Sequence, residues 1–107
     1  MSERLSLVVV LYVNAGREAD FERFETAVAA ILQRHGGALE RRIAMEGQDD
    51  PSRPHEVHIV TFPDRAALDR YRADPEFQAL AALRAEAIRE TVIWCGADRM
   101  PFGAQPA

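Results

Sequence analysis

The sequence predicts one small α+β domain whose elements follow the order β-α-β-β-α-β. A chain of 107 residues with 48% hydrophobic side chains has room for one core and too few residues for two. Apolar runs suited to strands alternate with segments whose apolar residues recur at helical spacing. Connection rules fold this order most simply into a four-stranded antiparallel sheet with both helices on one face. We expect a single domain over residues 1–96 and an irregular tail over residues 97–107.

The first strand is predicted at residues 5–13, and its two faces are both apolar. One face carries Leu5, Leu7, Val9, Leu11 and Val13, and the other carries Val8, Val10 and Tyr12. A strand that is apolar on both faces is a central strand covered on both sides. Arg4 before this run resembles the start of a secretory signal, but Glu3 offsets its charge and the run is too short to span a bilayer. We therefore expect a cytoplasmic protein without a membrane segment.

The first helix is predicted from about Glu18 to His35. Its apolar positions recur at helical spacing and form one face, and we expect Arg23, Glu25 and Arg34 outside that face. These apolar positions are Phe21, Phe24, Val28, Ile31 and Leu32. Gly36-Gly37 follows and ends the helix, because glycine adopts positive φ without a Cβ clash.

Two further strands are predicted on either side of a polar loop. Residues 38–46 alternate imperfectly, with Leu39, Ile43 and Met45 on one face, as expected of a strand near the sheet edge. Residues 47–54 are rich in turn-forming residues and predict an exposed loop. Residues 56–62 predict the third strand, which Pro63 ends.

The second helical region begins after Asp64, which is suited to cap a helix, and carries Leu68 and Tyr71 inward. Asp74-Pro75 marks a new helix start, so we expect a kink or break near residue 73. An apolar stripe then continues through Phe77, Leu80, Leu83, Ala87 and Ile88, and residues 91–96 form the final strand.

In this topology the first and third strands are the central pair, and one face of the sheet is left without helices. We assign Val8, Val10, Tyr12, Val60 and Phe62 to that open face. An apolar patch of this kind is a liability in a monomer, and packing it against the same face of a second copy covers it. We therefore expect a homodimer formed through the sheets. The same assignment places His58 on the open face.

Composition excludes several function classes. The net charge is −4 and no short window concentrates basic residues, so nucleic acid is not expected as a partner. All 13 basic residues are arginine, which removes Schiff-base chemistry through lysine. No nucleophile elbow and no glycine-rich phosphate loop occurs. The single cysteine, Cys95, has no internal disulfide partner, and its apolar surroundings predict a buried thiol.

Several short segments resemble a known family. They are His35-Gly36-Gly37, Phe62-Pro63, Ala66-Ala67-Leu68 with Tyr71, Asp74-Pro75-Glu76-Phe77-Gln78 and Leu83-Arg84. Together, over about residues 5–96, they resemble the family known as domain of unknown function thirteen-thirty, within the dimeric α+β-barrel superfamily. The resemblance implies a ferredoxin-like subunit, a dimer built through sheet faces and a small cavity in each subunit. Relatives often carry an acidic residue before the Phe-Pro pair, where this chain has Thr61.

The superfamily includes cofactor-free monooxygenases, haem-degrading enzymes and small-molecule isomerases, so the resemblance permits several chemistries. The second helical region contains no histidine, and the axial ligand expected there in haem-degrading relatives is missing. We therefore expect no cofactor.

His58 is the candidate catalytic residue, because an imidazole titrates near neutral pH and can act as a general acid or base. The alternative is a histidine that bonds across the dimer contact. His55 and His58 point to opposite faces of a strand and cannot share a metal ion, whereas Glu56 and His58 share a face. Catalytic metal sites usually have three protein ligands, and Glu56 and His58 supply only two, so we expect no metal.

The candidate ligand-binding residues are Arg41, Tyr71, Trp94 and Tyr12. Arg41 interrupts an apolar face and could direct its guanidinium into a cavity between sheet and helices, where an anion would suit it; alternatively it extends past the sheet edge. Tyr71 and Trp94 combine an apolar body with one polar group, which suits either a pocket or the core.

These residues predict a homodimer that binds a small apolar or weakly acidic molecule and could act on it as a cofactor-independent enzyme of the monooxygenase or isomerase type. The alternative is a dimeric accessory or regulatory module without catalysis. Substrate and reaction are not specified by the sequence.

Overall fold

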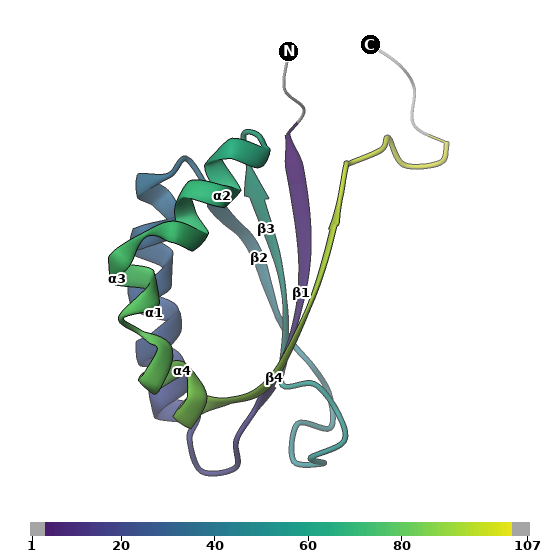
Figure 1. Ribbon diagram of the computed structural model, residues 1–107. Coiled ribbons are helices and arrows are strands. Elements are labelled where there is room, and N and C mark those ends of the chain that lie inside the picture. The colour runs from purple at the N-terminus through teal and green to yellow at the C-terminus, as the bar shows by residue number, and fades with distance from the viewer. Residues whose placement is uncertain (1–3, 104–107) are drawn as a thin grey trace.

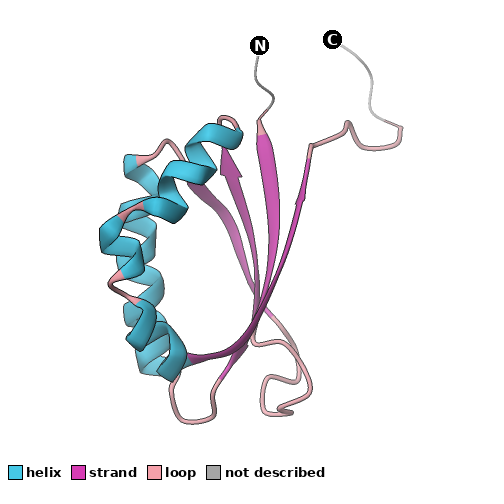
Figure 2. Cartoon of the chain, viewed as in Figure 1, coloured by secondary structure: helices cyan, strands magenta, loops and turns pink. Residues whose placement is uncertain are grey.

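A computed structural model describes residues 4–103 and shows two layers, a sheet and a layer of helices. The elements are β1 (Leu5–Val13), α1 (Glu18–Arg34), β2 (Ala38–Ala44), β3 (Glu56–Phe62), α2 (Arg65–Ala73), α3 (Pro75–Gln78), α4 (Ala81–Ala87) and β4 (Ile88–Gly96). The four strands pair antiparallel in the order β2-β3-β1-β4. The predicted element order and the central position of β1 and β3 are confirmed. All helices cover the same face of the sheet (Figures 1 and 2).

The second helical region is divided into three short helices. The Asp64 side chain accepts a hydrogen bond from the Ala67 backbone amide and caps α2. Asp74 caps α3 in the same way through the Glu76 amide, with Pro75 at the first helical position, as predicted. Ile88 was expected in the helix, but it begins β4 and pairs with Val13. The final strand therefore starts three residues earlier than predicted.

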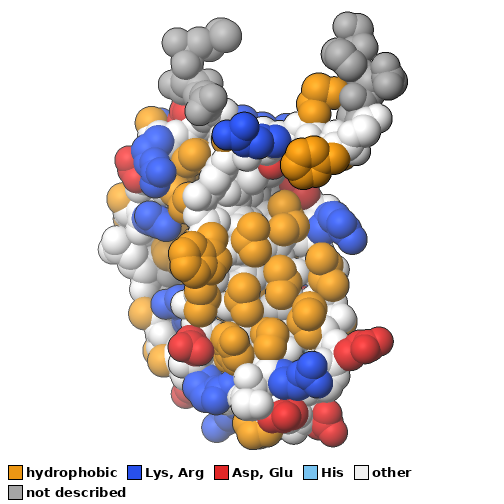
Figure 3. All heavy atoms as spheres, turned by 90° about the vertical axis from the view of Figure 1, so that its right-hand side faces the viewer, with side chains coloured by type: hydrophobic (Ala, Val, Ile, Leu, Met, Phe, Trp, Pro, Cys, Tyr) orange, Lys and Arg blue, Asp and Glu red, His pale blue; other side chains and the backbone are white. Residues whose placement is uncertain are grey.

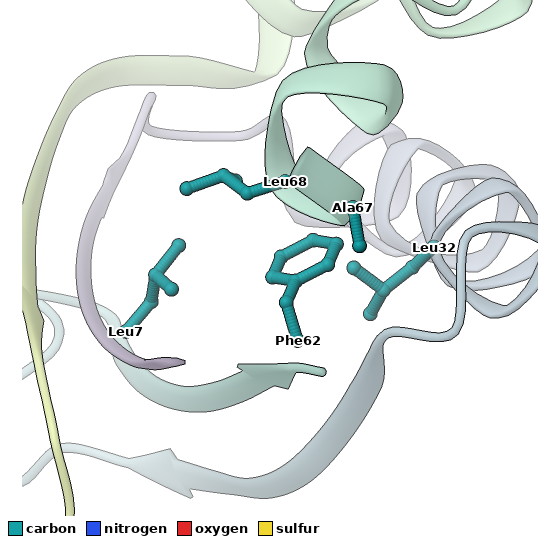
Figure 4. Close-up of a cluster of buried hydrophobic side chains, with 5 residues drawn as sticks. All are labelled: Leu7, Leu32, Phe62, Ala67 and Leu68. Carbon is teal, nitrogen blue, oxygen red and sulfur yellow. The ribbon is translucent and has the colours of Figure 1, made fainter. Parts of the chain in front are cut away.

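Two hydrophobic clusters join the helices to the sheet. In the first, Phe62 of β3 lies at the centre, with Leu32 and Ala67 on one side of its ring and Leu7 and Leu68 on the other (Figure 4). The second lies toward the other end of the sheet and comprises Leu11, Phe21, Phe24, Ala87 and Ile88. Partly buried Val9 packs against both clusters, so the two form one continuous layer.

The glycine pair after α1 has two separate roles. Gly36 adopts a φ of 76°, a conformation that favours glycine. A Cβ on Gly37 would lie 2.7 Å from Leu32 Cδ1 and 2.9 Å from Phe62 Cε1, so Gly37 is required by close packing. The turn from α1 into β2 thus depends on both residues.

The open face of the sheet is an apolar surface ringed by charged side chains (Figure 3). In β1 it carries Val8 and Val10, as predicted, together with their partners Ile59 and Val57 on β3. Trp94 of β4 lies opposite Val8 and is 67% exposed. The predicted apolar face without helices is therefore present.

The face assigned to the third strand was wrong. Phe62, Val60 and His58 face the helices: Phe62 is 1% exposed within the core, Val60 packs against that core and His58 is 3% exposed. Residues Val57, Ile59, Val60 and Phe62 make both faces of β3 apolar, so alternation could not indicate which face meets the helices. Consequently His58 does not lie on the face expected to form a dimer.

A register shift in β2 changes the predicted faces of the edge strand. Leu39 pairs with Val60 and Arg41 pairs with Ile59, which leaves Glu40 as an extra residue between them. Because such a bulge reverses the alternation, Leu39 faces the helices whereas Arg41 and Ile43 lie on the open face. The predicted common face of Leu39 and Ile43 was therefore wrong.

Beyond β4, residues 97–103 form no helix or strand, and residues 1–3 and 104–107 of the chain lie outside the described part. Cys95 is exposed, contrary to the predicted buried thiol, because β4 is an edge strand whose end diverges from the helices (Figure 1). None of the helices in residues 4–103 has the length and apolar character needed to cross a membrane.

Candidate functional site

A cavity of about 330 Å³ lies between the helices and the sheet. Its walls are mainly apolar and come from every strand and every helix, for example Val9, Phe24, Leu39, Leu68 and Ile93. Its polar lining consists of Glu25, His58, Tyr71, Arg72, Arg84 and Thr91. A largely apolar cavity with a few convergent polar groups is typical of a small-molecule site.

His58 lies at the centre of a buried polar network. Its Nε2 atom lies 2.8 Å from Oε1 of Glu56, two residues earlier on the same strand face. Arg42 holds that carboxylate with two bonds, Nε to Oε1 at 3.0 Å and Nη2 to Oε2 at 2.6 Å. Arg42 comes from β2 and lies opposite His58 in the strand pairing. The Arg42 guanidinium also contacts Glu22 of α1, so the network connects the helix to both strands.

The charge of Glu56 determines which nitrogen of His58 carries the proton. Burial works to raise the pKa of Glu56, but hydrogen bonds from Arg42 and His58 outweigh it and keep this pKa below its usual value. An ionised Glu56 can only accept, so Nε2 of His58 donates to it. In a neutral imidazole, Nδ1 is then the unprotonated nitrogen and can accept a proton.

Glu25 of α1 faces this nitrogen. Its Oε2 atom lies 3.8 Å from Nδ1 of His58, and its side chain is 17% exposed. Burial, reinforced by the negative charge of Glu56, raises the pKa of Glu25 to about 7, although Arg42 and Arg84 oppose the shift. The cavity therefore contains a carboxyl group that exchanges its proton near neutral pH, beside the imidazole of His58.

Tyr71 also lines the cavity, and its ring is held between Phe62 and Phe77, with centroid distances of 5.4 and 4.6 Å. Burial and the charge of Glu25 raise the pKa of the Tyr71 phenol, so this hydroxyl remains protonated and acts as a donor. Its role in ligand binding stays a prediction.

The chain matches the family described as domain of unknown function, DUF1330, over residues 7–96. It belongs to the DUF1330 family. No curated protein sequence matches it significantly.

Solved structures similar to this DUF1330 protein share its ferredoxin-like fold. SnoaB, a cofactor-independent oxygenase from Streptomyces nogalater, is 21% identical with a TM-score of 0.72, and the match covers 96% of this chain and 100% of SnoaB. A Caulobacter crescentus protein provisionally assigned as an antibiotic biosynthesis monooxygenase is 16% identical, with a TM-score of 0.76 and 92% of each chain covered. A ferredoxin-like protein of the DABB family from Mesorhizobium loti is 19% identical, with a TM-score of 0.63 and coverage of 94% and 98%. At these identities the likeness concerns the fold.

In this DUF1330 protein, the predicted site residues are divided between two faces of the sheet. His58 and Tyr71 line the cavity. Arg41, Tyr12 and Trp94 instead belong to the open face, where the Arg89 guanidinium lies 5.4 Å from the Tyr12 ring centroid. Arg41 was expected to point between sheet and helices, and the bulge at Glu40 places it on the opposite face. Trp94 is neither in the cavity nor in the core, because β4 alternates in register with β1.

Glu25 and Arg84 were not recognised as cavity residues. Glu25 follows Phe21 by four residues and precedes Val28 by three, which places a carboxylate within the apolar stripe of the helix. Arg84 lies on α4, and Glu76, eight residues before it, pairs with Arg34 at 3.0 Å. Within residues 4–103, no group of three or more His, Cys, Asp and Glu side chains is arranged to hold a metal ion.

Proposed function

We propose that this protein binds a small, largely apolar molecule between its helices and sheet and removes a weakly acidic proton from it, as a cofactor-independent enzyme of the isomerase or monooxygenase type. The observation that carries the proposal is the pairing of His58 Nδ1 with Glu25 at one side of a largely apolar cavity. A base held in a water-poor cavity contributes strongly to proton transfer because its geometry is already set.

In the proposed step, Nδ1 of His58 takes the proton from the bound molecule. The imidazole becomes a cation, which the ionised Glu56 stabilises through the bond to Nε2. Arg42 keeps Glu56 ionised and oriented, so the three side chains act as one unit. Because Oε2 of Glu25 lies 3.8 Å from Nδ1 of His58, Glu25 can exchange a proton with the same part of the substrate. The proton then returns to a different atom, giving an isomer, or the substrate anion reacts with dioxygen.

The fold accommodates this class of chemistry, since SnoaB is a cofactor-independent oxygenase of the same fold. This likeness supports the proposal only in general terms, because one fold hosts many functions.

We also propose that the protein is a homodimer in which two open sheet faces pack together. Val8, Val10, Val57, Ile59 and Trp94 make that face apolar, and two of them, Val8 and Trp94, are at least 39% exposed in the single chain. A contiguous exposed apolar patch surrounded by polar side chains marks an association site. The fold class of the relatives agrees with such an assembly.

Base-promoted ring opening of nitrobenzisoxazole tests the catalytic proposal. A base removes the ring C–H proton, the electron pair forms a nitrile, and the nitrogen–oxygen bond breaks to release a coloured phenolate. The compound is small, apolar and uncharged, so it suits the cavity. We expect the wild-type protein to accelerate the reaction and His58→Gln to lower the rate by roughly 100-fold.

His35→Gln is the matched control, because His35 bonds Asp74 at 2.8 Å and does not line the cavity. It should retain the wild-type rate. Equal rates for wild type, His58→Gln and His35→Gln would contradict proton transfer by His58 and favour the non-catalytic accessory module.

A further inference from the structure

One wall of the cavity gathers hydrogen-bond donors that have no acceptor. Arg72 of α2 and Arg84 of α4 both line it, and neither forms an ion pair with a carboxylate of residues 4–103. The Tyr71 hydroxyl has no protein acceptor within the described residues either. The Thr91 Oγ1 atom, on β4, is buried without a hydrogen-bond partner in the same part of the chain. Arg72 and Arg84 are exposed at the rim of the cavity, whereas the Thr91 hydroxyl is buried. Buried polar atoms are rarely left unpaired, so the Thr91 hydroxyl indicates a missing partner beside the two guanidinium groups.

These donors lie around one region of the cavity. Arg72 and Arg84 both lie close enough to Tyr71 to oppose the rise in the pKa of its phenol. Arg84 and Thr91 also line a second recess, which shares Phe77 and Ile88 with the cavity and so continues it toward the surface between α4 and β4. Arg84 therefore lies where the cavity opens, whereas His58 and Glu25 lie deeper within it.

We propose that the ligand of this cavity is an apolar carboxylate whose anionic group binds at Arg84, with Arg72, Tyr71 and Thr91 around it, and whose apolar body extends toward His58. A guanidinium donates two parallel hydrogen bonds to a carboxylate, and a phenol or hydroxyl completes the acceptor's coordination. The inference rests on the proposed function and adds the class of substrate and the direction in which it lies. Arg84 thereby orients the substrate so that its reacting end meets the imidazole.

Glu25 provides a second, independent prediction for the same site. Its ionised form adds negative charge to the cavity and opposes a carboxylate ligand. The groups that face Glu25 are Glu22 on its own helix, Glu56 and His58 on β3, Arg42 on β2, Tyr71 on α2 and Arg84 on α4. Because the pKa of Glu25 is about 7, carboxylate binding should weaken as the pH rises from 6 to 8. Glu25→Gln should remove that dependence.

Naphthoate and its uncharged counterpart naphthylmethanol test the inference by calorimetric titration. Both have the same apolar body, so they differ only at the group placed near Arg84. We expect the wild type to bind naphthoate at least about tenfold more tightly, since a hydrogen-bonded charge contributes roughly that factor. Arg84→Gln should remove this preference without weakening naphthylmethanol, and Arg72→Gln should reduce it.

Arg70→Gln is the matched control, because Arg70 is an exposed arginine of α2 that does not line the cavity. It should keep the full preference for naphthoate. Equal binding of the two compounds by the wild type would overturn the inference, and so would an equal loss in Arg70→Gln and Arg84→Gln, which would indicate general attraction by positive charge. Each of these outcomes leaves the proposed function intact, because nitrobenzisoxazole carries no anionic group and reports on His58 separately.

Discussion

Glu25 shows how a single side chain connects stability to the proposed chemistry. Its carboxyl group lies beside Glu56 and is largely shielded from water, so its charged form is disfavoured. A protein optimised only for stability would place an apolar residue at this position. Retaining a carboxyl there is typical of a functional site, where such groups have displaced pKa values.

Glu25→Gln should change how stability depends on pH. The ordinary pKa of 4.5 in the unfolded chain rises to about 7 in the folded protein. Between these values the folded chain keeps a proton that the unfolded chain has lost, so stability falls as pH rises through this window. Above the window the wild type carries a penalty of about 3 kcal/mol that glutamine, which cannot ionise, avoids.

Urea unfolding at pH 5 and pH 8 measures this effect. The wild type should lose more stability between these pH values than Glu25→Gln does. Glu18→Gln, an exposed position on the same helix, serves as the control and should follow the wild type. Parallel losses in all three proteins would show that Glu25 is ionised in the folded state at neutral pH.

At the scale of elements, the sequence predicted which segments form strands and helices but not all of their faces. The faces of β1 were assigned correctly: Leu7 and Leu11 pack into the two clusters, and Val8 lies on the open face. In β3 both sets of alternate residues are apolar, so His58 was assigned to the wrong face. In β2 the bulge at Glu40 depends on pairing with Val60 and Ile59, which no local pattern reveals.

The candidate site was predictable to a similar extent. His58 and Tyr71 were selected for their chemistry, and the structure places both in the cavity. The joint arrangement of His58, Glu56 and Arg42 depends on the register between β2 and β3, which the sequence does not state. Arg84 belongs to α4, whose position follows from the break at Asp74-Pro75 and the packing of Ala87.

The junction between α1 and β2 gives a prediction at the same scale. Gly37→Ala would place a methyl group against Leu32 and Phe62 in the first core cluster. We expect a loss of about 1–3 kcal/mol in the free energy of unfolding, because a packed core relaxes poorly around an added carbon.

Thermal or urea unfolding measures the loss, with Gly96→Ala as the control, since nothing lies within 4 Å of a Cβ at that glycine. The control should unfold like the wild type. If Gly37→Ala were as stable as the control, the close packing of this turn against Phe62 would be contradicted.

In the whole molecule, the two faces of the sheet differ in what covers them. The helix-covered face encloses the cavity, and the open face carries the apolar surface of Figure 3. A wild-type particle in solution should have about twice the 12.0 kDa mass of the chain.

Val8→Glu should yield a folded monomer, because this side chain lies on the open face and is already 39% exposed. Sedimentation equilibrium measures both masses. Ala30→Glu, at an exposed position on α1, is the control and should remain dimeric. A monomeric wild type would show that the open faces do not associate. A dimeric Val8→Glu would place the association surface elsewhere.

Methyl NMR shows whether ligands bind between the helices and the sheet. Neighbouring strand residues point to opposite faces, so Val9 and Val60 line the cavity whereas Val8 and Ile59 form a pair on the open face. With naphthylmethanol added, we expect shifted methyl signals for Val9 and Val60 and unchanged signals for Val8 and Ile59. Shifts at Val8 and Ile59 with Val9 and Val60 unchanged would contradict it.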